Sequence, residues 1–315
     1  MSPHELPDPH PFTERPSWAS DDVDLTRPSA ARVYDYMLDG NHNFQVDRDF
    51  ANELLAADPM LRFYARANRA FLQRFVRAAV GVGYDQFLDI GSGIPTVGNV
   101  HEIADRTRPD ATRVLYIDRE VVATRHTELL LREHGDPRRH HTIRGDLLDR
   151  DRLWRRIVDD GLFDLDRPVV LLVVAVLHFV KDAADPLGAL AFYRDVLPPG
   201  SLLVLSTMTN EAPESPEEAD ALRRVERQYE RTDSPGQLRS IAQFAPFFGD
   251  WPILPPGVVP PPGVVPPPSP TRSAAATTSG VVYATEWGSE AADDIAPFRR
   301  HRESRILVGV ARKPS

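Results

Sequence analysis

The stretch FLDIGSGIPTVGNV, residues 87–100, decides the predicted fold. An apolar run ends at Asp89, turns through Gly91 and Gly93, and continues with residues that suit a helix. A glycine turn between a strand and a helix is typical of sheets that bind nucleotide-like ligands, because the amides at a helix N-terminus can face such a ligand. The segment therefore predicts a ligand site where a strand gives way to a helix.

Strand-like and helix-like segments alternate after this turn. Short apolar, β-rich runs predict strands at 86–91, 113–118, 140–146, 168–180, 201–208 and 305–313. Helical patterns lie between the first five runs, at 98–108, 120–134, 150–160 and 186–197. This alternation is typical of a parallel sheet wound with crossover helices. The run at 168–180 is apolar on both faces, as expected for a central strand covered on both sides.

A helical segment precedes the sheet. Apolar residues at helical spacing predict helices at 27–40, 47–59 and 61–83, so residues 26–84 form an N-terminal helical segment and 85–315 the α/β core. Residues 1–25 are polar and proline-rich, without the apolar stretch of a signal peptide, and predict a loose tail.

The region after the fifth predicted strand is less regular. Two further helical patterns, at 215–232 and 234–249, are followed by a proline-rich loop at 252–272. Within this loop the hexad PPGVVP occurs twice in tandem, at 255–260 and 261–266. Such a stretch favours polyproline II and lacks amide donors for a sheet. A surface loop is the preferred interpretation, and a ligand for a proline-binding domain is the alternative.

Composition excludes several classes of function. The formal net charge is −9, which does not support a nucleic-acid partner, and there is no cysteine for a disulfide, a thiolate metal site or a cysteine nucleophile. The longest apolar stretch, 169–180, is too short to span a bilayer. We expect a cytoplasmic protein that acts on a small molecule, with no membrane contact; the oligomeric state cannot be read from the sequence.

The glycine turn favours one nucleotide-like ligand over another. A dinucleotide site requires G-x-G-x-x-G, but here Gly91 and Gly93 are followed by Ile94, Pro95 and Thr96, so the third glycine is missing. Pro95 also removes an amide donor close to where a pyrophosphate would need one. Asp89, the acid before the first glycine, can accept a hydrogen bond from an ammonium group, which S-adenosylmethionine carries and a dinucleotide lacks.

Two further acids follow the next predicted strands. Asp118 ends the second strand, the usual place for a carboxylate that holds ribose hydroxyls, and Asp146 ends the third, near an expected adenine amino group. Leu147 and Leu148 are available to pack on the adenine ring. A single aspartate after a strand is more often a turn or helix cap. Three in succession at one sheet edge favour S-adenosylmethionine.

These segments together resemble an actinobacterial family of S-adenosylmethionine-dependent methyltransferases, formerly a family of unknown function. The resemblance implies the class I methyltransferase (Rossmann-like) fold: an α/β, seven-stranded, mostly parallel sheet flanked by helices, with an N-terminal helical lid. The family usually has a single copy of PPGVVP. The matching segments are 28–55, 66–77, 86–102 ("QFLDIGSGIPTVGNVHE"), 113–120 ("RVLYIDRE"), 145–149 ("GDLLD"), 165–182 ("LDRPVVLLVVAVLHFVKD") and 308–313 ("VGVARK").

The resemblance also implies which residues bind the cofactor. The pocket residues it implies are Asp89, Gly91, Gly93, Asp118, Asp146 and Leu147. The predicted cofactor site also includes Ser92, Arg119 and Ala175. From the lid, Arg32, Tyr34 and Asn43 are expected to face the pocket, with Asn68 and Arg69 bracing it.

Methyl transfer from a sulfonium to a hydroxyl or amine needs alignment, exclusion of water and a base. His178, at the end of the fourth predicted strand, is the candidate base, and the alternative is a histidine held by the backbone. The neighbouring Phe179 could line the pocket or fill the core; core is preferred. No metal site is predicted. Two alternatives to an enzyme of this class stay open: a non-catalytic protein that binds S-adenosylmethionine or S-adenosylhomocysteine, and an NAD-dependent oxidoreductase.

Overall fold

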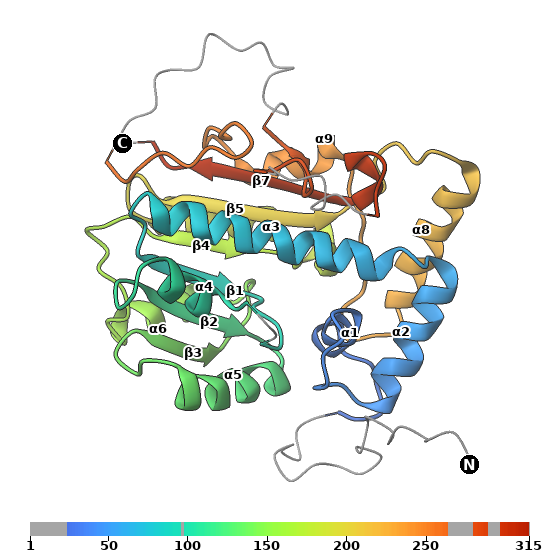
Figure 1. Ribbon diagram of the computed structural model, residues 1–315, viewed down its shortest axis with the longest axis horizontal. Coiled ribbons are helices and arrows are strands. Elements are labelled where there is room, and N and C mark those ends of the chain that lie inside the picture. The colour runs from blue at the N-terminus through green and yellow to red at the C-terminus, as the bar shows by residue number, and fades with distance from the viewer. Residues whose placement is uncertain (1–23, 96–97, 264–279, 289–296, 315) are drawn as a thin grey trace, which may run out of the picture.

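The computed structural model describes residues 24–95, 98–263, 280–288 and 297–314, and its centre is a single seven-stranded sheet (Figure 1). The strand order is β3-β2-β1-β4-β5-β7-β6; β1 to β5 are parallel, and β7 runs antiparallel to both of its neighbours. This confirms the predicted mostly parallel sheet. The strands are β1 (Gln86–Ile90), β2 (Arg113–Asp118), β3 (His140–Arg144), β4 (Val170–Val173), β5 (Leu202–Met208), β6 (Val282–Tyr283) and β7 (Ile306–Arg312).

Helices cover both faces of the sheet. One face packs against α3 (Leu61–Gly81), α4 (Val100–Thr107) and α5 (Val121–His134). The other packs against α6 (Arg150–Asp159), α7 (Pro186–Val196) and the short α9 (Ile241–Phe244). Because strand side chains alternate between faces, Val170 and Leu172 of β4 join the α3 side, whereas Leu171 and Val173 join the α7 side.

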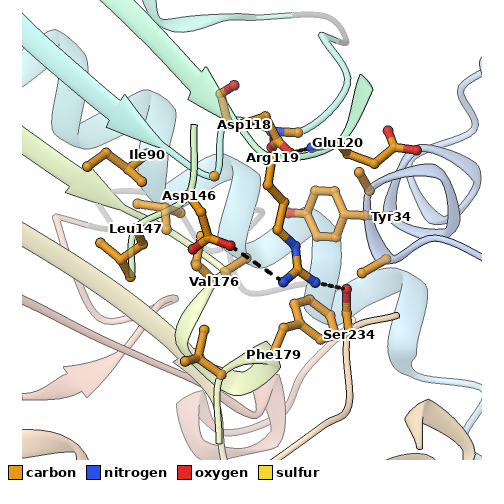
Figure 2. Close-up of a pocket in the computed structure, with 18 of the residues that line it drawn as sticks. Tyr34, Ile90, Asp118, Arg119, Glu120, Asp146, Leu147, Val176, Phe179 and Ser234 are labelled. Carbon is orange, nitrogen blue, oxygen red and sulfur yellow. Dashed lines mark hydrogen bonds and ion pairs between the residues drawn. The ribbon is translucent and has the colours of Figure 1, made fainter. Parts of the chain in front are cut away.

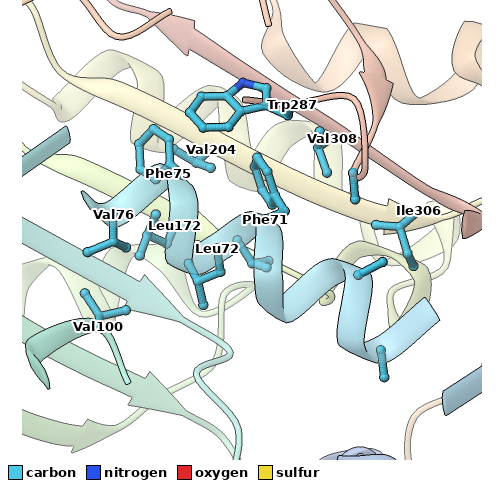
Figure 3. Close-up of a cluster of buried hydrophobic side chains, with 14 of the residues drawn as sticks. Phe71, Leu72, Phe75, Val76, Val100, Leu172, Val204, Trp287, Ile306 and Val308 are labelled. Carbon is cyan, nitrogen blue, oxygen red and sulfur yellow. The ribbon is translucent and has the colours of Figure 1, made fainter. Parts of the chain in front are cut away.

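The long helix α3 is fixed across the sheet by aromatic packing. Phe71 and Phe75 of α3 are fully buried beside Val204 of β5 and Trp287 (Figure 3). The rings of Phe71 and Trp287 meet edge to face with centroids 5.4 Å apart, a favoured aromatic geometry. Truncating a buried phenylalanine of this kind to alanine costs about 3–5 kcal/mol. This packing matters for function because α3 carries Asn68 and Arg69 to the carboxyl edge of the sheet.

Two shorter helices, α1 (Ala30–Met37) and α2 (Gln45–Ala57), lie beyond the carboxyl ends of β1 to β3 (Figure 1). Buried Asp47 joins them: its carboxylate accepts hydrogen bonds from the backbone amides of Ser29 and Phe44, at the N-caps of the two helices, and from Nε of Arg32 at 2.7 Å. One carboxylate thus satisfies donors at both helix starts, which explains why this segment folds as a unit. Helix α8 (Pro216–Tyr229) packs against α2.

Two sequence predictions about individual elements were wrong, and one short strand was not predicted. The single strand predicted at 168–180 ends at Val173, because Ala175 adopts a left-handed conformation with φ 59°, and a 3₁₀ helix follows at Leu177–Phe179. The helix predicted at 234–249 is confined to α9 and a 3₁₀ turn at Ala245–Phe248. The two-residue strand β6 was not recognised, because it is too short to show alternation.

Some predicted segments fall wholly or partly outside the described residues. Residues 1–23 of the predicted tail and 264–272 of the proline-rich loop lie outside them. The described start of that loop is tied to the sheet, since Ile253 forms an isolated antiparallel bridge with Ala311 of β7. Among the described residues, no helix has the length and apolar character needed to cross a membrane.

Candidate active site

A cavity of about 480 Å³ opens at the carboxyl edge of the sheet, between the strand ends and α1 (Figure 2). Asp89, Asp118 and Asp146, the three acids singled out in the sequence, all line it. So do Gly91, Ser92, Gly93, Arg119, Leu147 and Ala175 of the predicted cofactor site. The structure therefore brings the strand-end residues together around one cavity of a size ordinary for a small-molecule site.

The turn after β1 requires glycine. Gly91 and Gly93 have φ of 76° and 67°, in the left-handed region that disfavours side chains. A Cβ on Gly91 would also lie 2.2 Å from the side chain of Val176, so the turn can pass this close to the end of β4 only without a side chain. The Gly91 amide donates to the carbonyl of Ile117 at 2.7 Å, which holds the turn against β2.

Asp118, the last residue of β2, organises the turn as well as lining the cavity. Its Oδ2 accepts a hydrogen bond from the Gly93 amide at 2.8 Å, and its Oδ1 accepts one from the Glu120 amide at 2.9 Å. Burial raises its pKa, and these backbone amides lower it. Each oxygen has a second lone pair, so the carboxylate can still accept bonds from a ligand's hydroxyl groups.

Asp89 is a buried carboxylate at the end of β1 that lines the cavity. Burial raises its pKa to about 7, an effect that the charge of Asp118 increases and the guanidinium of Arg69 opposes. Within the part of the chain that the structure describes, no hydrogen-bond donor contacts this carboxylate, although it lines the cavity. Nε of Arg69 is likewise buried without a hydrogen-bond partner there. A carboxylate and a guanidinium thus both line the cavity, which suits a zwitterionic ligand group.

Arg119 crosses the cavity from the end of β2 (Figure 2). Its Nη2 donates to Oγ of Ser234 at 2.7 Å and to the carbonyl of Asp233 at 3.0 Å, and its Nη1 lies 3.9 Å from Oδ2 of Asp146. Leu147 is buried beside Asp146 and provides an apolar surface. The arginine therefore links the β3 end of the cavity to the segment that follows α8.

The predicted lid residues divide into two groups. Tyr34, Asn68 and Arg69 line the cavity. Arg32 and Asn43 do not line this cavity. The Arg32 guanidinium forms ion pairs with Asp47 at 2.7 Å and with Glu120 at 2.9 Å. The side-chain amide of Asn43 donates to the carboxylate of Asp35 in α1 and to the carbonyl of Gly40 after α1. These two side chains hold α1 and α2 together and hold α1 against the core.

His178 does not line the cavity, because its ring is bonded to the backbone of β5. Its Nδ1 accepts a hydrogen bond from the Met208 amide at 3.1 Å, and its carbonyl accepts one from the Gln237 amide at 2.8 Å. Burial, together with the charge of Arg239, lowers its pKa to about 3, so the ring is neutral. With Nδ1 an acceptor, the proton of the neutral ring is on Nε2, and neither nitrogen is free to accept a proton.

Several lining residues were not identified from the sequence. Apolar ones come from α3 and from the segment after β4, where Phe179 lines the cavity, in contrast to the preferred core role. Glu120 was overlooked although it lies only two residues after Asp118; burial raises its pKa to about 7, despite the opposing charge of Arg32. No sequence signal marks the others, because they reach the cavity only through tertiary packing: Ser29, Leu72, Val176, Val180 and Ser234.

The strand order, the antiparallel β7 and the cavity at the carboxyl edge define a class I methyltransferase fold. Residues 16–314 match the family described as S-adenosyl methyltransferase, and the chain belongs to this family. It is therefore a methyltransferase by family and fold, which decides against the alternative of an NAD-dependent oxidoreductase.

Two solved structures are similar to the chain over nearly its whole length. A DUF574 family protein from Streptomyces avermitilis is 30% identical, with 91% of this chain and 98% of that chain covered and a TM-score of 0.76. A proposed methyltransferase from Thermobifida fusca is also 30% identical, with 93% and 97% covered and a TM-score of 0.75. A search among curated proteins found no match.

Proposed function

We propose that this protein binds S-adenosylmethionine in the cavity and transfers its methyl group to an oxygen or nitrogen nucleophile of a small molecule. The observation that carries the proposal is the meeting of Asp89, Asp118 and Asp146 around one cavity behind a glycine turn that excludes a Cβ. The family supports the reaction class. The cofactor and the kind of acceptor are inferred from the site.

The residues present fit the cofactor group by group. Asp118 would accept bonds from the ribose hydroxyls through lone pairs that the backbone amides leave unused. Asp89, which no described donor contacts, would hold the ammonium group, and Arg69, which also lines the cavity, would hold the carboxylate. Asp146 and Leu147 would meet the amino group and face of the adenine ring.

When bound, S-adenosylmethionine supplies a methyl group on a sulfonium, ready for in-line displacement. The protein's part is to align the acceptor with that methyl and to exclude water. Leu72, Val176 and Phe179 give the cavity apolar surfaces beside the end of β4, which suits a small acceptor with an apolar portion. The geometry of His178 favours a structural role, so no base is assigned to this residue.

Calorimetric titration with S-adenosylhomocysteine, the demethylated product, tests the proposal. We expect saturable binding by the unmodified protein and about 100-fold weaker binding by Asp118→Ala, because the ribose hydroxyls lose their charged acceptor and the turn loses its anchor. Asp159→Ala, at an exposed position at the end of α6, is the matched control and should bind normally. Absence of binding by the unmodified protein would reject the proposed function.

A further inference from the structure

A chain of hydrogen bonds runs behind the cavity and joins two of its walls. The Ala175 amide donates to Oγ of Ser206 at 2.8 Å, and the Ser206 hydroxyl donates to Oδ1 of Asn68 at 2.6 Å. Nδ2 of Asn68 donates to the Tyr34 hydroxyl at 2.9 Å, which donates to the Ala65 carbonyl at 3.1 Å. The chain therefore passes from the end of β4 through β5 and α3 to α1.

The direction of this chain follows from its first member. A backbone amide can only donate, so Ser206 must accept from Ala175, and its own hydroxyl hydrogen is left for Asn68. That bond fixes the Asn68 carbonyl toward Ser206, and its amino group therefore turns toward Tyr34 and the cavity. Tyr34 accepts one of the two amide hydrogens of Asn68. No acceptor among the described residues takes the other, which leaves it for a ligand.

Ser206 is fully buried and does not line the cavity, whereas Ala175, Asn68 and Tyr34 all do. Ala175 has a left-handed backbone conformation, φ 59°, which is unfavourable for a residue with a Cβ and persists only where its surroundings enforce it. The bond from its amide to Ser206 is one such constraint. A single hydroxyl thus acts on a strained wall residue and on the Asn68–Tyr34 pair.

We propose that Ser206 is a positioning residue of the cofactor site, which orders the end of β4 and the lid helix α1 together without touching the ligand. The inference rests on the proposed function. It implies that cofactor affinity depends on a side chain outside the cavity, and that Ser206 and Tyr34 act through the same connection. Removing either hydroxyl interrupts that connection, so removing both should add little.

The protein offers a closely matched control residue, Ser201, at the other end of β4 and β5. Oγ of Ser201, just before β5, accepts a hydrogen bond from the Val169 amide, just before β4, at 3.0 Å. Ser201 is also fully buried. It makes the same kind of inter-strand bond as Ser206, but at the amino edge of the sheet, away from the cavity. Both Ser201→Ala and Ser206→Ala remove an amide-to-hydroxyl bond between the β4 and β5 segments, but only Ser206→Ala also removes the bond to Asn68.

The experiment measures S-adenosylhomocysteine affinity by calorimetry and thermal stability in parallel. We expect Ser206→Ala and Tyr34→Phe each to weaken binding about tenfold, and the double variant about tenfold to twentyfold, because coupled residues are not additive. Ser201→Ala should also lower the melting temperature, because the Val169 amide loses its acceptor, but should bind normally. If Ser206→Ala does not fold, Ser206→Cys, which keeps the shape with a weak hydrogen-bonding group, takes its place.

Amide hydrogen exchange adds a readout that a purely local role would not move. In Ser206→Ala we expect faster exchange in α1, residues 30–37, with little change in the β5–β7 ladder. Independent effects that multiply to about 100-fold, or normal binding by Ser206→Ala, would overturn the inference. Lack of binding by the unmodified protein would instead reject the proposed function, so the two failures are distinguishable.

Discussion

The two halves of the cavity are built in different ways. The half formed by Asp89, Asp118 and Asp146 consists of residues at or just after strand ends, held by bonds to near neighbours in the sheet. The half formed by α1 and the segment 174–184 is held by side chains far away in the sequence. In the first half, topology alone brings the residues together; in the second, individual long-range hydrogen bonds do so.

Arg239 is the clearest case of the second kind. Its buried guanidinium donates to the carbonyls of Leu177 and Val180, each at 2.6 Å, and to the carboxylate of Asp182 at 2.6 Å. It thereby closes the segment that carries Phe179 into the cavity. Removing the Arg239 guanidinium and removing the Asp118 carboxylate should therefore have different effects on stability and on binding, which tests whether the two halves are independent.

We expect Arg239→Leu to lower the free energy of unfolding by about 3 kcal/mol, because it leaves buried carbonyls without a donor. Urea denaturation measures this loss, and amide exchange should rise across residues 177–182. Affinity for S-adenosylhomocysteine should fall less than about threefold, because Arg239 holds residues 177–182, none of which is proposed to contact the cofactor. The exposed Arg224→Leu on α8 is the control and should change neither quantity. A 100-fold loss of affinity in folded Arg239→Leu would show that the halves are not separable.

Asp89, in the half built at the strand ends, should make ligand binding depend on pH. Its pKa is raised to about 7, so below that pH the unliganded protein holds a neutral acid. A cationic group beside Asp89 favours the ionised form, so binding then requires release of a proton. Affinity for S-adenosylhomocysteine should therefore fall by up to about tenfold per pH unit below pH 7. Titrations from about pH 5.5 to 7.5 keep the ligand's amine protonated.

The same raised pKa has the opposite consequence for the unliganded protein. The folded state binds a proton that the unfolded state has already lost between about pH 4 and 7, so this contribution to stability falls as the pH rises through that window. Asp89→Asn should remove both dependences. The pKa of Glu120 is also raised to about 7, so Glu120 contributes to the pH dependence of stability in both the unmodified protein and Asp89→Asn. The contribution of Asp89 is therefore the difference between the two stability curves. Equal pH slopes of affinity in the two proteins would contradict an ammonium site at Asp89.

What could be predicted from the sequence follows this division. β2 was predicted at its exact bounds, and the acids at the strand ends were identified, because strand periodicity and the parallel order together place them at one edge. The predicted strand at 168–180 failed where Ala175 turns left-handed, a conformation that Ala does not itself favour and that the bond to Ser206 helps to impose. Arg239 and Ser206 carried no local signal, since each acts on residues about 30 or more positions away.

Substitution of His178 should have the smallest effect on stability of the changes considered, and it tests directly whether a role inferred from sequence position holds in the structure. The sequence placed it at a strand end and made it a candidate base; the structure places it in a 3₁₀ helix, where Nδ1 accepts from the Met208 amide. His178→Ala should cost about 1–2 kcal/mol in urea denaturation, because that buried amide loses its acceptor, while S-adenosylhomocysteine affinity is unchanged. In His178→Asn the side-chain oxygen can replace Nδ1 and should recover most of the stability. An asparagine can accept this hydrogen bond but cannot act as a base. Full stability in His178→Ala would contradict the structural explanation, and His178 would again be a candidate base.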